Sequence, residues 1–212
     1  MYFCKLSNAY MYVIFKYTTC LRRNSIKLML VSSKSSITLQ KTLTTSFACS
    51  TIALLDADTF IVGTINHPHP VRTISVNGQE GDIRHKLLPD QKYQINGSFC
   101  TYMPCTKTVV FTVQAKGTVY MCDITSGEGR VIKSDKLRSP RRVCGGPADT
   151  VFVCSRDTPS VVQLSPQGDE LMSYDFGMKF PYAVSFSSDG TRLAVTSSAL
   201  TPNIINLFVV SS

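Results

Sequence analysis

The segment Lys136-Leu137-Arg138-Ser139-Pro140-Arg141-Arg142 is the densest cluster of charged side chains of one sign in this sequence. A guanidinium group carries several N–H donors in one plane and can bind a phosphate or a carboxylate through two of them. Pro140 restricts the backbone of the segment, so we expect its four cations to be displayed together. The pattern therefore favours the binding of an anion, and a solvated basic loop is the alternative.

Histidine and cysteine residues could supply other chemistry. His67 and His69 flank Pro68 in a predicted turn, where the intervening residue directs the two rings apart, so we expect solvated side chains and no metal site. The eight cysteines include no Cys-x-x-Cys pair, and most of them lie in apolar runs, where a free thiol packs as a small hydrophobic group. We expect reduced thiols in an intracellular, cytoplasmic protein without a cofactor, with a Cys100–Cys105 disulfide as the less favoured alternative.

Four internal repeats must position these residues. In each one a short turn precedes a run of alternating apolar residues, and the copies align on Thr59, Thr108, Thr150 and Thr191, at spacings of 49, 42 and 41 residues. That period is close to the length of one propeller blade. Turns rich in Gly, Pro and Asp separate runs rich in Val, Phe, Ile and Thr, and no stretch has the pattern of a helix.

The repeats predict an all-β fold, a partial β-propeller of about four blades, each a four-stranded antiparallel sheet. A β-sandwich is the alternative, but whole repeating units argue against it. The predicted blades are residues 47–88, 98–137, 141–176 and 182–212, and the last of them lacks a fourth strand. An isolated strand at residues 36–43 precedes the first blade. It belongs either to a vestigial preceding blade in an open arc or to the last blade, paired with residues 204–210.

Residues 1–35 are predicted to be a basic N-terminal extension or a vestigial blade with strands at 11–17 and 26–31. Residues 1–50 hold seven of the eight net positive charges and no acidic residue. The apolar stretch at residues 2–20 is interrupted by Lys5 and Lys16, and it is too short and too polar for a membrane span. It also lacks the apolar centre and the cleavage site of a secretory signal. We therefore expect no membrane partner, with a basic amphipathic membrane contact as the less favoured alternative.

Propeller topology divides the connections between strands into two faces of opposite charge. The basic face is predicted to carry the cations Arg72, Lys92, Lys116, Lys136, Arg138, Arg141, Arg142, Arg156 and Lys179. The opposite face is predicted to carry the acids Asp56, Asp58, Glu80, Asp82, Glu128, Asp149, Asp169, Glu170 and Asp189. A basic face of this kind attracts phosphates or acidic segments. The alternative is that the acids serve turn chemistry and the cations serve solubility.

Within the basic face the predicted partner-binding residues are Lys136, Arg138, Arg141, Arg142, Arg156 and Lys179. The expected partner is a protein or single-stranded RNA. Stacking of RNA bases would need aromatic rings nearby, for which Tyr93 and Tyr182 are the candidates, although Tyr182 is expected to pack within its strand.

The segment Phe180-Pro181-Tyr182-Ala183-Val184-Ser185-Phe186-Ser187-Ser188-Asp189-Gly190-Thr191-Arg192-Leu193-Ala194-Val195-Thr196 resembles an NHL-type propeller repeat, in which a Pro, a small apolar strand, an Asp-Gly turn and a second strand follow one another. Residues 139–144 with 149–153 are similar. The resemblance covers residues 47–212 and is greatest to the carboxy-terminal propellers of tripartite-motif (TRIM-NHL) proteins. The Asn-His-Leu signature of the repeat is absent, and such propellers usually have six blades, so the chain resembles a fragment or a shortened relative. WD40 repeats match less well, because the chain has no Trp.

Relatives of this kind are ubiquitin ligases, but the zinc-binding patterns of their RING and B-box domains are absent here. The resemblance therefore implies a non-enzymatic binding or scaffold module, such as the substrate-recognition part of a ligase of this kind. The alternative is a metal-dependent hydrolase propeller similar to gluconolactonases. That enzyme would need carboxylates on the first strands, and the segments 50–54, 99–103, 142–145 and 183–186 contain neither a carboxylate nor a His.

Overall fold

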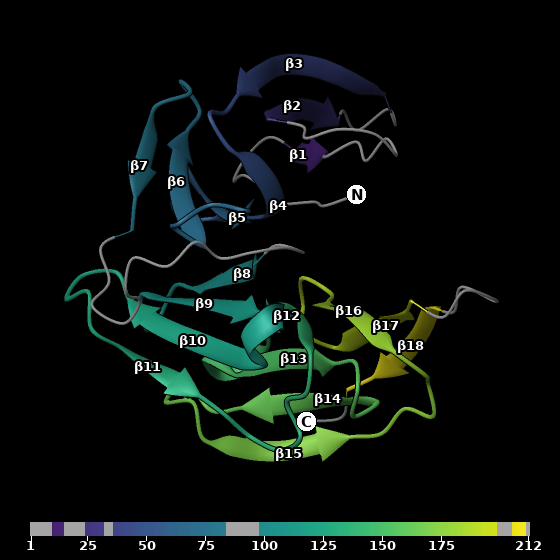
Figure 1. The fold of residues 1–212 in the computed structure, drawn as a ribbon. Coiled ribbons are helices and arrows are strands. Elements are labelled where there is room, and N and C mark those ends of the chain that lie inside the picture. Colours follow the sequence, from purple (N-terminus) through teal and green to yellow (C-terminus); the bar gives the residue numbers. More distant parts are fainter. Residues whose placement is uncertain (1–9, 15–23, 32–35, 84–97, 199–204, 211–212) are drawn as a thin grey trace. The chain divides into compact units, whose positions relative to one another are not determined.

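The computed structural model describes residues 10–14, 24–31, 36–83, 98–198 and 205–210 (Figure 1). Its described residues form strands β1 to β18 and two short 3₁₀ turns, η1 (Gln114–Lys116) and η2 (Pro147–Asp149). The chain divides into two compact units, Met1–Arg84 with Leu88–Cys100 and His85–Leu87 with Thr101–Ser212. No helix among the described residues is long and apolar enough to cross a membrane.

The first unit contains two antiparallel sheets. One consists of β1 (Tyr10–Ile14), β2 (Ser25–Val31) and β3 (Ile37–Thr44). The other consists of β4 (Ala48–Leu54), β5 (Thr59–Ile65), β6 (Val71–Ser75) and β7 (Glu80–Asp82). Ile26, Phe60 and Ile74 are fully buried in the core of this unit, which both sheets share.

Strand β3 contains the segment that the sequence predicts as an isolated strand. It pairs with β2 from Ser25 opposite Thr44 to Val31 opposite Ile37. Such pairing is the one expected for a strand of a preceding blade. The predicted strands at 11–17 and 26–31 correspond to β1 and β2.

The second unit continues the same plan (Figure 1). Strand β8 (Ser98–Met103), which begins in the last residues of the first unit, forms a sheet with β9 (Thr108–Val113), β10 (Thr118–Asp123) and β11 (Gly129–Ile132). The next sheet contains β12 (Pro140–Gly145), β13 (Val151–Ser155), β14 (Ser160–Leu164) and β15 (Glu170–Tyr174). The last contains β16 (Pro181–Phe186), β17 (Arg192–Ser197) and β18 (Ile205–Val209). In each sheet the strand order follows the chain, as in the blades of a β-propeller.

The repeat alignment predicts that Phe60, Val110, Phe152 and Leu193 lie on corresponding strands. This prediction is confirmed, because each lies on the second strand of its sheet and each side chain is buried. Burial of a side chain of this size stabilises the fold by about 1.5–3 kcal/mol. The alternating apolar residues therefore provide the layers between neighbouring blades.

Two such layers lie within the second unit. Met103, Val110 and Val119 pack with Val143, Val153 and Leu164, which joins the β8–β11 sheet to the β12–β15 sheet. Cys154 and Val161 pack with Val184, Leu193 and Val195, which joins the β12–β15 sheet to the β16–β18 sheet. The first strands β12 and β16 lie close to each other across the second layer. This packing sets the distance between the side chains of β12 and those of β16.

Candidate anion-binding site

A β-bulge in β12 directs two consecutive arginines towards one aromatic ring. Pro140 pairs with Ser155 and Val143 pairs with Val153, so three steps along β12 match two steps along β13. Consecutive side chains of a regular strand point to opposite faces, and a bulge changes their direction. The guanidinium carbons of Arg141 and Arg142 lie 5.8 Å and 5.2 Å from the centroid of the Tyr182 ring on β16.

Phe180, which precedes Pro181 and Tyr182, adds a second aromatic surface. Phe180 has a φ of +55°, which is unusual for a bulky residue, and 42% of it remains exposed. The guanidinium carbon of Arg156, on the β13–β14 turn, lies 5.2 Å from the centroid of the Phe180 ring. A cation over a ring face is attracted by the ring quadrupole, which holds the guanidinium in a fixed place.

The backbone has the same conformation and the same type of hydrogen bond at the start of both blades of this site. Ser139 and Phe180 each precede the first proline of a blade, and both have positive φ values, +50° and +55°. The Ser155 hydroxyl donates a hydrogen bond to the Arg138 carbonyl at 2.9 Å, and the Ser197 hydroxyl donates one to the Lys179 carbonyl at 2.5 Å. Arg138 and Lys179 therefore hold equivalent positions, and both are exposed.

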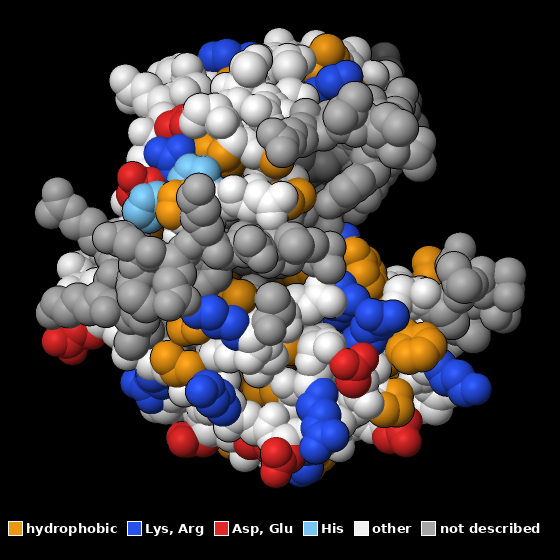
Figure 2. Space-filling model, viewed as in Figure 1, with side chains coloured by type: hydrophobic (Ala, Val, Ile, Leu, Met, Phe, Trp, Pro, Cys, Tyr) orange, Lys and Arg blue, Asp and Glu red, His pale blue; other side chains and the backbone are white. Residues whose placement is uncertain are grey.

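Five of the six predicted binding residues thus lie in this part of the second unit. We call these five residues the basic cluster: Arg138, Arg141, Arg142, Arg156 and Lys179. Figure 2 shows Lys and Arg side chains beside hydrophobic side chains in the region where Figure 1 places β12 and β16. The sequence did not single out Phe180 as part of the site. Its position before a Pro at the start of a strand, like that of Ser139, is the signal that could have identified it.

Positive charge in the basic cluster is only partly compensated. Burial and the neighbouring charge of Arg156 lower the pKa of Arg141. The Nε atoms of Arg141 and Arg156 are buried and make no hydrogen bond within the described part of the chain. Arg141 Nη1 donates to Gln114 Oε1 of η1, while the nearby carboxylate of Asp157 accepts a hydrogen bond from the Ser139 hydroxyl. A bound anion would relieve the repulsion between these like charges.

Lys136 is the predicted binding residue that the structure engages elsewhere. Its ammonium group lies 2.6 Å from Glu170 Oε1 at the start of β15, and the Ser134 hydroxyl donates to the other oxygen of Glu170. The sequence predicts Lys136 and Glu170 on opposite faces, and this ion pair contradicts that prediction. The connection between β11 and β12 lies against the first residue of β15, in the next blade. This contact brings the two charges together.

Arg72 gives a similar correction in the first unit. The sequence predicts Arg72 on the basic face and Glu80 and Asp82 on the opposite face. The structure pairs Arg72 with both, at 2.9 Å from Glu80 Oε2 and 2.6 Å from Asp82 Oδ1, because β6 and β7 are neighbouring strands. Of the other predicted residues, Lys92 and Tyr93 lie outside the described residues. The separation of charge between the faces is therefore weaker than the sequence predicts.

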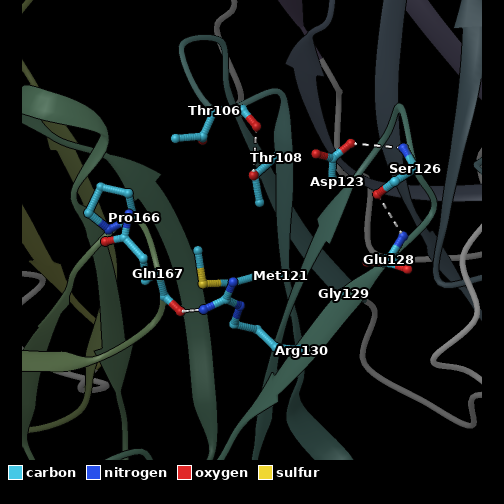
Figure 3. A pocket seen from close by; sticks show the side chains of 10 residues that line it. All are labelled: Thr106, Thr108, Met121, Asp123, Ser126, Glu128, Gly129, Arg130, Pro166 and Gln167. Atoms are coloured by element: carbon cyan, nitrogen blue, oxygen red, sulfur yellow. Dashed lines mark hydrogen bonds between the residues drawn. The ribbon is translucent and has the colours of Figure 1, made fainter.

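A separate polar cavity of about 370 Å³ lies between the β8–β11 and β12–β15 sheets (Figure 3). Arg130 reaches across it to donate a hydrogen bond to the Gln167 carbonyl on the β14–β15 turn. Asp123 Oδ1 accepts hydrogen bonds from the backbone N–H groups of Thr125 and Ser126, and these lower the pKa of the Asp123 carboxyl. The two charged groups thus serve the contact between blades and a tight turn.

Metal ligands do not converge in the part of the chain that the structure describes, where no group of three or more His, Cys, Asp or Glu residues could hold an ion. The first strands β4, β8, β12 and β16 carry neither a carboxylate nor a His. Cys49, Cys122 and Cys154 are buried free thiols, and Cys105 is an exposed one.

No protein-family model matches the chain, and no curated protein matches it in sequence. Solved structures match it in fold. It is similar to hydrazine synthase of Kuenenia stuttgartiensis (TM-score 0.60, 14% identity, covering 76% of this chain and 46% of that one). It is also similar to a functionally unknown protein from Desulfotomaculum acetoxidans (TM-score 0.62, 13% identity, covering 89% of this chain and 59% of that one). A third similar structure is virginiamycin B lyase from Staphylococcus aureus (TM-score 0.61, 13% identity, covering 99% of this chain and 70% of that one).

The chain spans 46% and 59% of the length of the first two of these structures. At 13–14% identity the likeness concerns the arrangement of the strands alone, and it carries no activity from one protein to another. Together with the strand order of the sheets, it shows that the chain has the β-propeller fold.

Proposed function

We propose that this chain is a non-enzymatic binding module that recognises an anionic partner, RNA or an acidic protein segment, through the basic cluster. The observation that carries the proposal is the gathering of three guanidinium groups over two neighbouring rings, with Arg141 and Arg142 at Tyr182 and Arg156 at Phe180. Phosphate and carboxylate oxygens are the acceptors that such guanidinium groups bind best. The propeller fold suits a binding or scaffold role of this kind.

The resemblance to NHL-type propellers supports the same role. In a ligase of the tripartite-motif kind, this module would be the part that recognises the substrate. The first strands carry no carboxylate for a central metal, which favours binding over the hydrolase alternative.

The test compares two triple variants by fluorescence anisotropy with a labelled single-stranded RNA pool and with a labelled acidic peptide. R138A/R141A/R142A removes three cations of the basic cluster, and K107A/K133A/R192A removes the same charge from exposed positions elsewhere in the second unit. We expect the first variant to lose at least about tenfold in affinity and the control to lose much less. For RNA, the slope of log affinity against log salt should become shallower by about two.

The better-bound probe identifies the class of partner. Equal retention of both probes by the two triple variants would contradict the proposal, because binding would then follow total charge and not this site.

A further inference from the structure

A second cavity in the second unit has different chemistry from the basic cluster. It has a volume of about 790 Å³ and lies between the β12–β15 sheet and the β16–β18 sheet. Its wall includes Phe152, Tyr174 and Phe186, and its rim is formed by the turns at residues 145–150 and 187–191. Sites for small molecules or single side chains usually have volumes of this order, about 300–1,000 Å³.

The aromatic wall has rings at two orientations. The Phe152 and Phe186 rings lie 4.8 Å apart at 65°, and the Phe152 and Tyr174 rings lie 6.3 Å apart at 21°. The Tyr174 hydroxyl donates a hydrogen bond to Gln163 Oε1 at 2.8 Å, which fixes the ring. Gly146 leaves space for Phe152, since a Cβ there would lie 2.5 Å from Cε2 of that ring. The steeply inclined Phe152 and Phe186 rings form a corner. The face of an aromatic ring has a negative electrostatic potential and attracts cations.

Three hydroxyl groups of the rim, those of Thr150, Ser187 and Thr191, already donate hydrogen bonds within the protein. The Thr150 hydroxyl donates to the Pro147 carbonyl, and the hydroxyls of Ser187 and Thr191 both donate to Asp189 Oδ1. The backbone N–H of Thr191 also donates to Oδ1, so three hydrogen bonds hold the Asp189 carboxylate in place. This carboxylate is an acceptor on the rim and suits a ligand that donates.

The charge of the residues that line the cavity also favours a ligand that donates hydrogen bonds, namely a cation. Asp189 is the one residue with a charged side chain among those that line the cavity, and no Lys, Arg or His is among them. Hydrogen bonds from Ser187 and Thr191 lower the pKa of Asp189 to about 2, so the group is ionised at neutral pH. An anion would be repelled, whereas a cation would find one counter-ion and a wall of aromatic side chains.

We propose that this cavity binds an organic ammonium group, with the cation against Phe186 and Tyr174 and with Asp189 as its counter-ion. The ammonium can be a lysine or methylated-lysine side chain of a partner or a free methylated amine, which share this chemistry. The proposal does not depend on the basic cluster, because none of the cluster residues lines the cavity.

The first experiment measures binding of choline and of its neutral isostere 3,3-dimethylbutanol to the full chain by isothermal titration calorimetry. The two ligands have the same shape, and only choline is charged. We expect choline to bind at least about tenfold more tightly, since the ring quadrupole and the carboxylate attract only a cation. Equal affinities, or no binding of any ammonium probe, would overturn the proposal.

Matched variants locate the binding. D189N removes the charge, and F186L replaces the ring by an aliphatic side chain; each should weaken choline binding at least about fivefold. D175N is the control, because Asp175 is an exposed acid that also accepts a turn hydrogen bond, from Gly177 N, but lies outside the cavity. F186L keeps the test decisive if D189N fails to fold, and a loss with D175N equal to those of the other variants would contradict the assignment.

A third experiment distinguishes a side chain of a partner protein from a free methylated amine. It compares the affinities for a trimethyl-lysine peptide, its acetyl-lysine counterpart and choline. A clear preference for the trimethylated peptide over choline would assign the site to a protein side chain, and similar affinities would assign it to free amines. Tighter binding of the acetylated peptide than of the trimethylated one would overturn the role of the charge. R138A/R141A/R142A should bind choline as the parent does, which keeps this result separate from the test of the proposed function.

Discussion

Arg142 lies over the ring of Tyr182, with 5.2 Å between the guanidinium carbon and the ring centroid, and the preceding Arg141 reaches the same ring at 5.8 Å. Two consecutive residues share one platform because β12 contains a bulge at this point. The platform belongs to the next blade, so packing between blades decides how the two cations are presented.

This relationship predicts that the ring of Tyr182, and not its hydroxyl, supports anion binding. Y182A should weaken binding of the preferred anionic probe several-fold, because both guanidinium groups lose their support. Y182F keeps the ring face and should stay within about twofold of the parent. Anisotropy titrations, with thermal melts to confirm folding, provide the measurement, and an equal loss in the two variants would assign the effect to the hydroxyl.

Gly168 should be much less tolerant of a side chain than Gly177. Both have positive φ values, +90° and +66°, so alanine is strained at either position. A Cβ at Gly168 would also lie 2.5 Å from Ile132 Cδ1 on β11, whereas the space at Gly177 is open. We expect G177A to cost about 1 kcal/mol of unfolding free energy and G168A roughly 1–3 kcal/mol more, measured by urea denaturation. Equal costs would show that the β11 contact is readily displaced.

Thiol reactivity should separate Cys105 from the buried cysteines. Burial raises the pKa of both Cys49 and Cys122 to about 11, so about one thiol in a thousand is ionised at pH 8. Cys105 is exposed. Iodoacetamide labelling followed by peptide mass spectrometry should modify Cys105 first and the other two only on unfolding. Rapid labelling of Cys122 in the native protein would contradict the burial of β10.

The ion-pair network of Arg72 should make the first unit sensitive to acid. Burial raises the pKa values of Glu80 and Asp82, but hydrogen bonds from Ser46 to Glu80 and from Arg72 to Asp82, with the charge of Arg72, lower both overall. Carboxyls with depressed pKa values stabilise the fold above their unfolded values, near pH 4, and lose this contribution as the pH falls through the folded values.

R72Q should therefore melt at a lower temperature than the parent at pH 7, and the difference should shrink below about pH 4. K41Q, which removes an exposed charge on β3, serves as the control. A difference for R72Q that is the same at all pH values would exclude the carboxylates as its cause.

Strand β18 predicts self-association, as an open arc of blades would. It is the last strand of a three-stranded sheet, and its side chains Ile205, Leu207 and Val209 are 68%, 72% and 85% exposed. A row of apolar side chains on an edge strand favours pairing with another chain. L207K should reduce concentration-dependent association in sedimentation velocity, while V131K, a change at another exposed apolar residue, should not. A parent protein that stays monomeric at all concentrations would refute this prediction.

Local pattern alone was enough to place the strands and turns of this protein. The alternation around Phe60, Val110, Phe152 and Leu193 identifies the second strand of each blade, because burial on one face requires a period of two along the chain. The turn residues divide the blades for the same local reason. The density of positive charge likewise predicts Arg141 and Arg142 as binding residues from the sequence alone.

Tertiary structure decided which charges meet. Lys136 and Glu170 are 34 residues apart, and Arg156 and Phe180 come from different blades, so no local pattern relates them. The bulge that turns Arg141 and Arg142 to one ring, and the corner of Phe152, Tyr174 and Phe186 around the second cavity, likewise result from the packing of whole sheets. The physical reason is that periodicity depends on neighbouring residues, whereas side-chain contacts between blades depend on the register and orientation of entire sheets.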